Sequence, residues 1–421
     1  MDVNQEEVEQ LKEELEEQEK KKKRKELIRF WGLLALTLLA TTMSGAEWIT
    51  LKYVFLSEPF NMTWADFAKG FEYSIPFLLI LTCHEFGHYL TARHYKINVS
   101  LPLYIPMWLP IGTTIGTFGA FIRIREKIKS RIQYFDIGIA GPLAGFVVAL
   151  GVLYYGFSNL PEPNHIYDIH PEYEVFGEDY GEIVYSKDTF ILKTEFAKVK
   201  PDLAEYYPDT AYRFTTATPS IRLGNNLIFD YFKKHVADPK LLPNDFEIMH
   251  YPWLFAGYLA LFFTALNLLP IGQLDGGHIL YGLIGRKNHT YVSSILFVGF
   301  VYYAGLGMID FSERFEDMMI TFPLYLFFLY ICFYSMFEDK RNRMMLAVIV
   351  FASQFFTKFF IPDVAGYEGW LVFAFLIGRF LGVKHPSAEK DEPLDLQRQV
   401  LGWIALLIFI GSFSPRPFVF G

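Results

Sequence analysis

Long runs of apolar residues, separated by shorter polar segments, dominate this chain. Nine such runs are present, and several approach the roughly 20 residues that a helix needs to cross the hydrocarbon of a bilayer. The last few runs are shorter. The runs cover residues 28–43, 73–93, 134–157, 251–270, 291–309, 321–337, 344–361, 366–382 and 399–413. We therefore expect an all-α polytopic membrane protein with about 8–9 transmembrane helices.

The first 26 residues are highly charged and precede the first apolar run. Pairs such as Glu16–Lys20 and Glu17–Lys21 have the i,i+4 spacing and the order that stabilise a helix. We interpret this segment as a solvated charged helix, and a regulatory or partner-binding arm is the alternative. Because acidic residues lie ahead of the basic cluster, the first run is interpreted as an uncleaved signal anchor rather than a cleaved signal peptide.

Basic clusters between the apolar runs predict how the chain crosses the membrane. If successive runs alternate in direction from a cytoplasmic N-terminus, all six clusters fall on the cytoplasmic side, in agreement with the positive-inside rule. The same alternation places the segment 158–250 outside. The clusters are Lys20–Lys25, Arg93–Lys96, Arg123–Arg131, Arg286–Lys287, Lys340–Arg343 and Arg379–Lys384.

The segment 158–250, called the insert below, is acidic and rich in aromatic residues. Alternating apolar and polar residues, as in Gly181–Lys193, are typical of strands. A disordered linker would contain fewer aromatic residues. The insert is therefore predicted to be a small folded extracytoplasmic domain.

Residues 101–122 are apolar but cannot form a spanning helix. Pro102, Pro106 and Pro110 interrupt the segment, followed by Gly112, Gly116 and Gly119. Irregular backbone at membrane depth is tolerated only where protein or a water-filled cavity satisfies its polar groups. We expect a re-entrant β-hairpin beside a polar site, and the alternative is an interfacial loop.

Composition agrees with a membrane protein and excludes some functions. Hydrophobic residues make up 52% of the 421 residues and aromatic residues 18%, and the net charge is −8. Because no basic domain stands out, the chain is not expected to bind nucleic acid. The two cysteines, Cys83 and Cys332, exclude a disulfide framework.

The motif His84-Glu85-Phe86-Gly87-His88 lies within the second apolar run. On a helix, positions i and i+4 share one face, so both imidazoles can reach one metal ion while Glu85 polarises a water molecule. Ionisable residues in an apolar span are costly and usually functional. The alternative is a pair of core histidines bonded to neighbouring carbonyl groups.

A second motif, residues 267–278, offers a third ligand. A catalytic zinc site needs three protein ligands and an open position. Asp275 ends an apolar span that is expected to run in the same direction as the HExxH span, which brings both sets of polar residues to similar depth. Asp275 as a turn or cap residue is the alternative. His278 is expected to hydrogen-bond rather than to bind the metal.

Together these residues resemble the site-2 protease family of intramembrane metalloproteases, over roughly residues 73–285. His84–His88 is similar to its HExxH helix, residues 267–276 to its NxxPxxxLDG element, and Gly138–Gly145 to its small-residue helix. The resemblance implies that His84, His88 and Asp275 bind Zn²⁺, that Glu85 is the catalytic base, and that Asn267 helps to hold the substrate or the oxyanion. The insert shows no clear PDZ carboxylate-binding loop, so no PDZ module is assigned. The Pro/Gly-rich stretch 101–122 and the long insert resemble the plastid and cyanobacterial subgroup of the family.

The resemblance implies an intramembrane zinc metalloendopeptidase that cuts single-span membrane proteins, in the cell inner membrane or a plastid membrane. A transporter or scaffold that uses His and Asp as an ion relay is the alternative. The sequence indicates nothing about oligomeric state. The predicted regions are a cytoplasmic charged helix (1–26), a membrane region with the HExxH helix and hairpin (27–157), the insert (158–250), a membrane region with the LDG motif (251–285) and C-terminal transmembrane helices (286–421).

Overall fold

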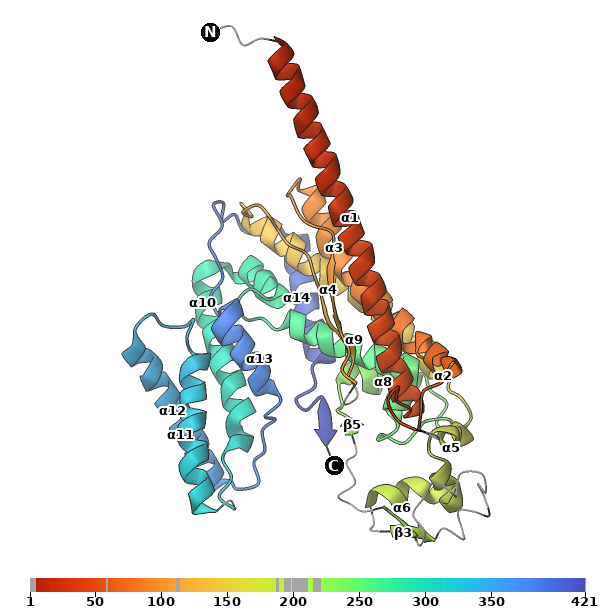
Figure 1. The fold of residues 1–421 in the computed structure, drawn as a ribbon. Coiled ribbons are helices and arrows are strands. Elements are labelled where there is room, and N and C mark those ends of the chain that lie inside the picture. The colour runs from red at the N-terminus through yellow and green to blue at the C-terminus, as the bar shows by residue number, and fades with distance from the viewer. Residues whose placement is uncertain are drawn as a thin grey trace. The chain divides into compact units, whose positions relative to one another are not determined.

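The computed structural model of the chain is mostly helical, with three short two-stranded sheets among the described residues (Figure 1). The structure describes residues 5–57, 60–110, 114–186, 189–192, 198, 211–214, 221–312 and 314–420. The chain forms two compact units. Unit 1 comprises Met1–Glu126, Ala144–Leu261 and Phe418–Gly421, and unit 2 comprises Lys127–Leu143 and Phe262–Pro417.

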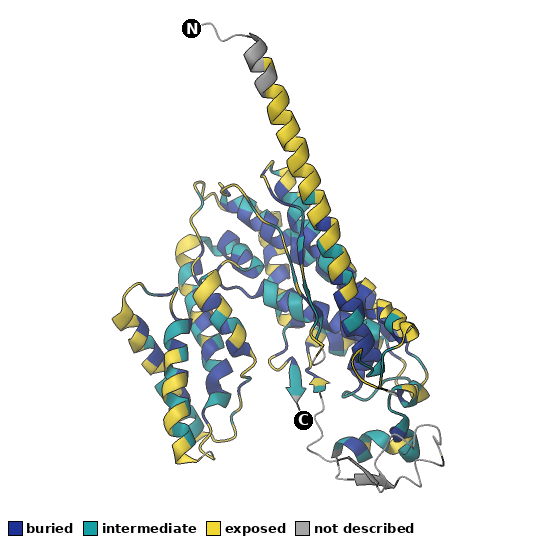
Figure 2. Ribbon diagram, in the orientation of Figure 1, coloured by how far each residue is buried: buried dark blue, intermediate teal, exposed yellow. Residues whose placement is uncertain are grey.

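Helix α1 (Gln5–Thr50) joins the predicted charged helix and the first predicted span into one element. Its N-terminal half is exposed and carries the expected pairs Lys20–Glu16 (3.9 Å) and Lys21–Glu17 (2.7 Å). Its C-terminal part is buried (Figure 2). There it packs against α2 (Trp64–Lys69) and α3 (Phe71–His94). The two halves are predicted from the sequence as separate segments because their polarity differs. In the structure they form one helix, since no residue between them interrupts it.

The segment 101–122 forms the predicted hairpin. Strand β1 (Leu103–Met107) pairs antiparallel with β2 (Gly116–Phe121), and the register shifts between Tyr104 and Pro106. The hairpin lies against α1 in unit 1, where the Trp48 indole donates a hydrogen bond to the carbonyl of Thr114 (2.8 Å). The hairpin is thus confirmed, whereas its membrane depth stays a prediction.

The insert contains short helices around a small core of Ile166, Tyr173 and Val184. The strand prediction for 181–193 is wrong at 181–186, which belong to helix α6 (Tyr180–Ser186). It is right for strand β3 (Thr189–Leu192), which pairs with β4 (Ala211–Phe214), and residues 187, 188 and 193 lie outside the described part of the chain. Short apolar clusters do not distinguish helix from strand, and the burial of Val184 in this core accounts for the helix. Its elements include η1 (Pro163–His165), α5 (Ile166–Ile169), η2 (Pro171–Asp179), α6 (Tyr180–Ser186), β3 (Thr189–Leu192), β4 (Ala211–Phe214), β5 (Ile221–Leu223), α8 (Leu227–His235) and η4 (Ile248–His250). Strand β5 pairs with β6 (Phe418–Phe420).

Unit 2 is built around the buried aromatic residues Phe297, Phe333 and Trp370. Two helices pass from one unit to the other along the chain, α4 (Arg131–Ser158) and α9 (Pro252–Leu268). The remaining helices are α10 (Asp275–Gly305), η5 (Leu306–Met308), α11 (Phe315–Cys332), α12 (Lys340–Phe360), α13 (Trp370–Leu376), η6 (Ile377–Leu381) and α14 (Leu396–Ser412).

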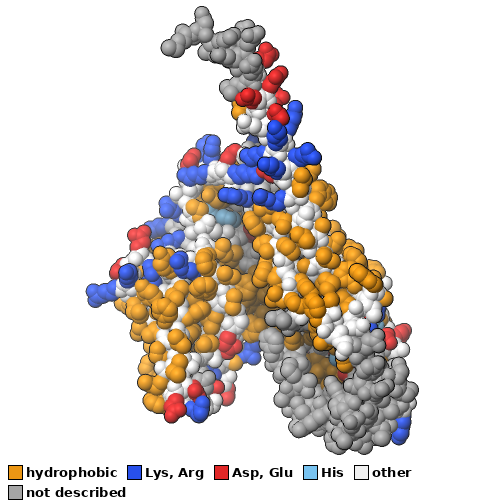
Figure 3. Space-filling view, viewed as in Figure 1, with side chains coloured by type: hydrophobic (Ala, Val, Ile, Leu, Met, Phe, Trp, Pro, Cys, Tyr) orange, Lys and Arg blue, Asp and Glu red, His pale blue; other side chains and the backbone are white. Residues whose placement is uncertain are grey.

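Five of the described helical segments are long and apolar enough to cross a membrane, and three shorter apolar helices accompany them. The five segments are Lys12–Thr50, Arg131–Ser158, Asp275–Met308, Phe315–Cys332 and Lys340–Phe360, and the three are Pro252–Leu268, Trp370–Leu381 and Leu396–Ser412. These eight correspond to eight of the nine predicted runs, and the ninth run is α3. Hydrophobic side chains cover much of the visible surface (Figure 3), as expected for contact with lipid. The number of spans stays a prediction.

Close packing between α1 and the start of α3 predicts that substitutions at two glycines change the stability of the protein by different amounts. A Cβ atom at Gly70 would lie 2.0 Å from the carbonyl oxygen of Thr42, whereas one at Gly32 meets nothing within 4 Å. We expect Gly70→Ala to destabilise the protein by about 1–3 kcal/mol through overpacking. Gly32→Ala, on the exposed face of α1, is expected to be neutral or slightly stabilising. Thermal unfolding in detergent measures both, and equal unfolding temperatures would contradict the packing.

Candidate metal centre

Helix α3 places both histidines of the HExxH motif on one face. The Nε2 atoms of His84 and His88 lie 3.1 Å apart, and their rings meet edge to face with centroids 4.8 Å apart. Both side chains are buried, with 7% and 6% of their surface exposed. The i,i+4 spacing therefore produces the paired imidazoles that the sequence predicts.

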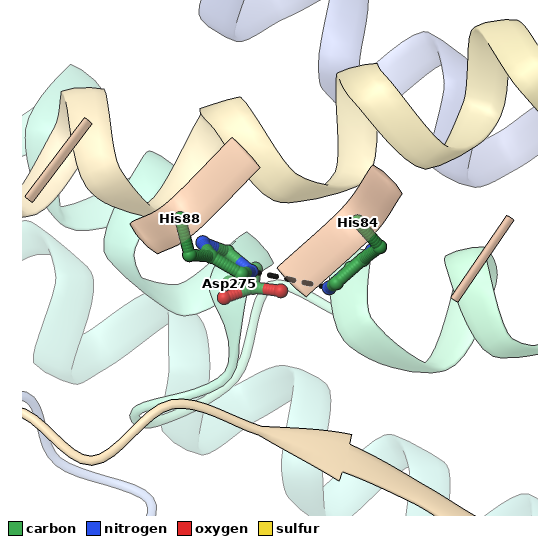
Figure 4. Close-up of side chains that lie close together, drawn as sticks. All are labelled: His84, His88 and Asp275. Atoms are coloured by element: carbon green, nitrogen blue, oxygen red, sulfur yellow. Dashed lines mark hydrogen bonds between the residues drawn. The ribbon is translucent and has the colours of Figure 1, made fainter. Parts of the chain in front are cut away.

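Asp275 also lies beside this pair. One ligand atom from each of His84, His88 and Asp275 lies within 4.8 Å of the others, and the Asp275 carboxylate points toward the imidazoles (Figure 4). Two imidazole nitrogens and a carboxylate oxygen are donors that zinc accepts. The separation of the two Nε2 atoms is close to the ~3.3 Å expected between ligands on tetrahedral zinc. The donor set therefore fits a zinc ion.

The position of Asp275 in its helix differs from the sequence prediction. Asp275 was expected at the end of an apolar span, but α9 ends at Leu268 and Asp275 is the first residue of α10. The loop between them turns at Gly272, which has a φ of 62°. A Cβ atom at Gly276 would lie 1.9 Å from the carbonyl oxygen of Leu268. Small residues thus allow the chain to leave one helix and begin the next within a few residues.

Gly145 on α4 allows close approach to His84. A Cβ atom at Gly145 would lie 3.1 Å from the Cβ of His84 and 3.4 Å from its Nδ1. Small residues such as the glycines of residues 138–145 permit tight helix packing. For Gly145, the neighbour is one of the predicted metal ligands, so this packing also fixes where the imidazole lies.

Glu85 is buried, with 5% of its surface exposed, and directly follows His84 on α3. The hairpin approaches the same helix, because the hydroxyls of Tyr104 on β1 and Thr82 on α3 are 2.8 Å apart. An ionisable carboxyl group that is buried on an apolar helix is expected to have a functional role.

Two further residues of the second motif lie in unit 2. Asn267 is partly buried near the end of α9, and its substrate or oxyanion role stays a prediction. His278 forms a hydrogen bond between its Nδ1 and the Nε2 of His385 (2.7 Å) and stacks on Tyr134. The expected hydrogen bonding of His278 is thus present.

Apolar helices of spanning length and a buried HExxH helix define a membrane protein of the zinc-peptidase class. Residues 72–306, more than half of the chain, match Peptidase family M50, and the chain belongs to this family. The resemblance to site-2 proteases is thereby confirmed.

Curated plant relatives agree with this family. "Probable zinc metalloprotease EGY2, chloroplastic" of Oryza sativa subsp. indica is 27% identical over 59% of this chain and 34% of its own length. "Probable zinc metalloprotease EGY1, chloroplastic" of Arabidopsis thaliana is 25% identical over 53% of this chain and 31% of its own length. The matched part thus spans about a third of these relatives. No solved structure matches the chain significantly.

The contact between α4 and His84 predicts a selective loss of metal affinity. Gly145→Val is expected to weaken zinc binding by about 10-fold or more, because the added side chain displaces a ligand imidazole. Gly151→Val on the same helix is the matched control, since a Cβ atom there meets nothing within 4 Å. Competition with a chromogenic chelator measures the affinity. Equal zinc affinity in both variants would show that Gly145 does not position His84.

Proposed function

We propose that this protein is an intramembrane zinc metallopeptidase that hydrolyses peptide bonds within or near transmembrane segments of single-span membrane proteins. The observation that carries the proposal is the convergence of His84, His88 and Asp275 beside the buried Glu85. The family and the printed names of the relatives support the same chemistry.

The residues of the site have separate tasks in this proposal. His84, His88 and Asp275 hold the ion, which supplies Lewis acidity toward the scissile carbonyl and acidifies water when bound. The Glu85 carboxylate accepts the proton of the attacking water and delivers it to the leaving amine nitrogen. Because Glu85 is buried, the proton stays within the site between the two steps. Asn267 is proposed to hold the substrate backbone or the oxyanion.

The hairpin offers an edge for an extended substrate. A peptide bond within a membrane helix is accessible only after the helix unwinds, and the freed backbone groups then need partners. Among the described residues, β2 pairs only with β1, which leaves its other edge for strand addition. Phe118 on β2 is 70% exposed and is proposed to contact the substrate.

The N-terminus is proposed to lie in the cytoplasm. In unit 1, three of the predicted basic clusters meet in one surface groove, whose lining includes Lys22 of α1, Arg93 of α3 and Arg125 after β2. Arg125 also pairs with Glu26 of α1. Lys and Arg side chains gather around this part of α1 (Figure 3). Their common location supports one cytoplasmic face. The membrane is proposed to be the cell inner membrane, or a plastid membrane as the names of the relatives indicate.

Exchange of the proposed base separates metal binding from catalysis. Glu85→Gln is expected to retain zinc but to lower cleavage at least about 100-fold, because general acid–base catalysis contributes about 10²–10⁴-fold. His84→Ala is expected to lose both zinc and cleavage. A single-span membrane protein co-purified or reconstituted with the enzyme serves as substrate, and zinc is quantified by mass spectrometry.

The matched control is Glu72→Gln, an exposed glutamate on the same helix, which is expected to cleave normally. Wild-type cleavage by Glu85→Gln would refute the role of Glu85. If the purified wild-type protein holds no zinc at His84, His88 and Asp275 and does not cleave the substrate, the ion-relay alternative would be favoured.

The proposed orientation predicts opposite accessibility of two exposed glutamates. In a chain with Cys83→Ala and Cys332→Ala, Glu178→Cys in the insert is expected to react with an impermeant maleimide in intact cells. Glu13→Cys in α1 is expected to react only after the membrane is permeabilised. Labelling of both residues from the same side would contradict the topology.

A further inference from the structure

A second group of metal-ligating side chains lies in the insert, away from the HExxH motif in sequence. One ligand atom from each of His170, Glu247 and His250 lies within 4.8 Å of the others. His170 lies between α5 and η2, and the other two residues lie at η4, just before α9. Glu247 is 0% and His250 is 3% exposed. All three residues belong to unit 1.

The distances between the three ligand atoms are close to those around one tetrahedral ion. The two Nε2 atoms are 3.4 Å apart, and Glu247 Oε2 lies 3.4 Å from Nε2 of His250 and 3.8 Å from Nε2 of His170. Ligands on one tetrahedral zinc ion are separated by about 3.3–3.5 Å, because each bond is about 2.0–2.2 Å long. Two of the three separations fall in this range and the third, at 3.8 Å, is slightly longer, so the atoms are spaced close to the ligands of a common ion.

The hydrogen bonds of the outer ring nitrogens fix the tautomers that a metal requires. Nδ1 of His250 contacts the backbone carbonyl of Trp48, and Nδ1 of His170 lies 3.2 Å from the carboxylate of Glu172. Both oxygens only accept, so each Nδ1 carries the proton, and in the neutral ring Nε2 presents a lone pair. Metal-binding histidines characteristically donate their other N–H to a carbonyl or a carboxylate.

The Glu247 carboxylate is also held by a hydrogen bond at one atom while its other oxygen is left for a metal ion. The Tyr185 hydroxyl donates a hydrogen bond to Oε1, which orients the group. Oε2 faces the two imidazoles, is buried, and makes no hydrogen bond in the part of the chain that the structure describes. Three lone-pair acceptors thus converge inside the protein, and such an arrangement requires a cation to be stable.

We propose that His170, Glu247 and His250 bind a second ion of the zinc class. Two imidazoles and one carboxylate favour zinc over the oxygen-preferring calcium or magnesium ions. Glu247 and His250 are buried, and His170 is partly buried, so the ion would be largely shielded from solvent. The ion ties the early part of the insert to the residues before α9 and, through Trp48, to the end of α1. This inference does not rest on the proposed peptidase activity.

The competing occupant of the cluster is a proton. Burial lowers the pKa of His170, but the hydrogen bond to Glu172 and the Glu247 charge outweigh it and raise this pKa above its usual value. A protonated His170 would donate toward the other two residues without any metal. The two occupants differ in metal content, so a direct measurement separates them.

Metal content of the full-length protein tests the proposal. After equilibration with Zn²⁺ and removal of free metal, the wild-type chain is expected to hold two zinc ions. A His84→Ala/His88→Ala variant is expected to hold one. Adding His170→Ala/Glu247→Gln to that variant is expected to remove the remaining ion, with at least a ~10-fold loss of bound zinc, since two of three ligands are changed.

His165→Ala is the matched control, because His165 is a neighbouring histidine of the insert outside the ligand set. This control is expected to retain two zinc ions. X-ray absorption of the His84→Ala/His88→Ala variant requires no further substitution and is expected to show nitrogen and oxygen ligands at about 2.0–2.2 Å. A zinc-free His84→Ala/His88→Ala variant would overturn the second site and favour the proton. Zinc that is lost only on changing His170 and Glu247 would instead support the second site and contradict the first.

Discussion

The cost of burying imidazole and carboxylate groups among apolar side chains is the constraint on which this structure depends. An unpaired buried charge costs several kcal/mol or more, so such groups need a cation or a complete set of hydrogen bonds. His84, His88 and Glu85 are each at most 7% exposed on a helix of an otherwise apolar region. Within unit 1, the absence of a side chain at Gly145 leaves room for the His84 imidazole.

The same cost of burial applies to the HExxH cluster and to the cluster of His170, Glu247 and His250 in the insert, but the sequence shows the two clusters in different ways. In the first cluster, one helix supplies two candidate ligands four residues apart, so spacing alone predicts a metal site. In the second, His170 and His250 are 80 residues apart, and no repeat or spacing connects them. Sequence reasoning missed the second cluster because only the folding of the insert brings its members together. Its one sequence signal was the presence of histidines in an acidic, aromatic segment.

Sequence patterns predicted the helices and the hairpin, because these elements depend on the residue types within one segment. Long apolar runs predicted the main helices, and the prolines and glycines of 101–122 predicted the β1–β2 hairpin. Features that depend on packing between distant segments were harder to predict from the sequence. Val184 lies in a core with Ile166 and Tyr173, which selects a helix at 180–186 where alternation indicated a strand. Asp275 was placed in the right motif but at the wrong end of a helix, because hydrophobicity does not show where the loop after Leu268 ends.

The glycines around the LDG motif explain why an aspartate can serve as a ligand there. Gly272 turns the backbone in a conformation that other residues rarely adopt, and Gly276 and Gly277 lie against the carbonyl groups of Leu268 and Gly272. A side chain at either of these two positions would force the loop away from the start of α10. The carboxylate of Asp275 is short and has little reach of its own, so its location follows that of the backbone. Loop compactness is therefore the physical property that places the proposed third ligand, and a longer loop with the same aspartate would not place it equivalently.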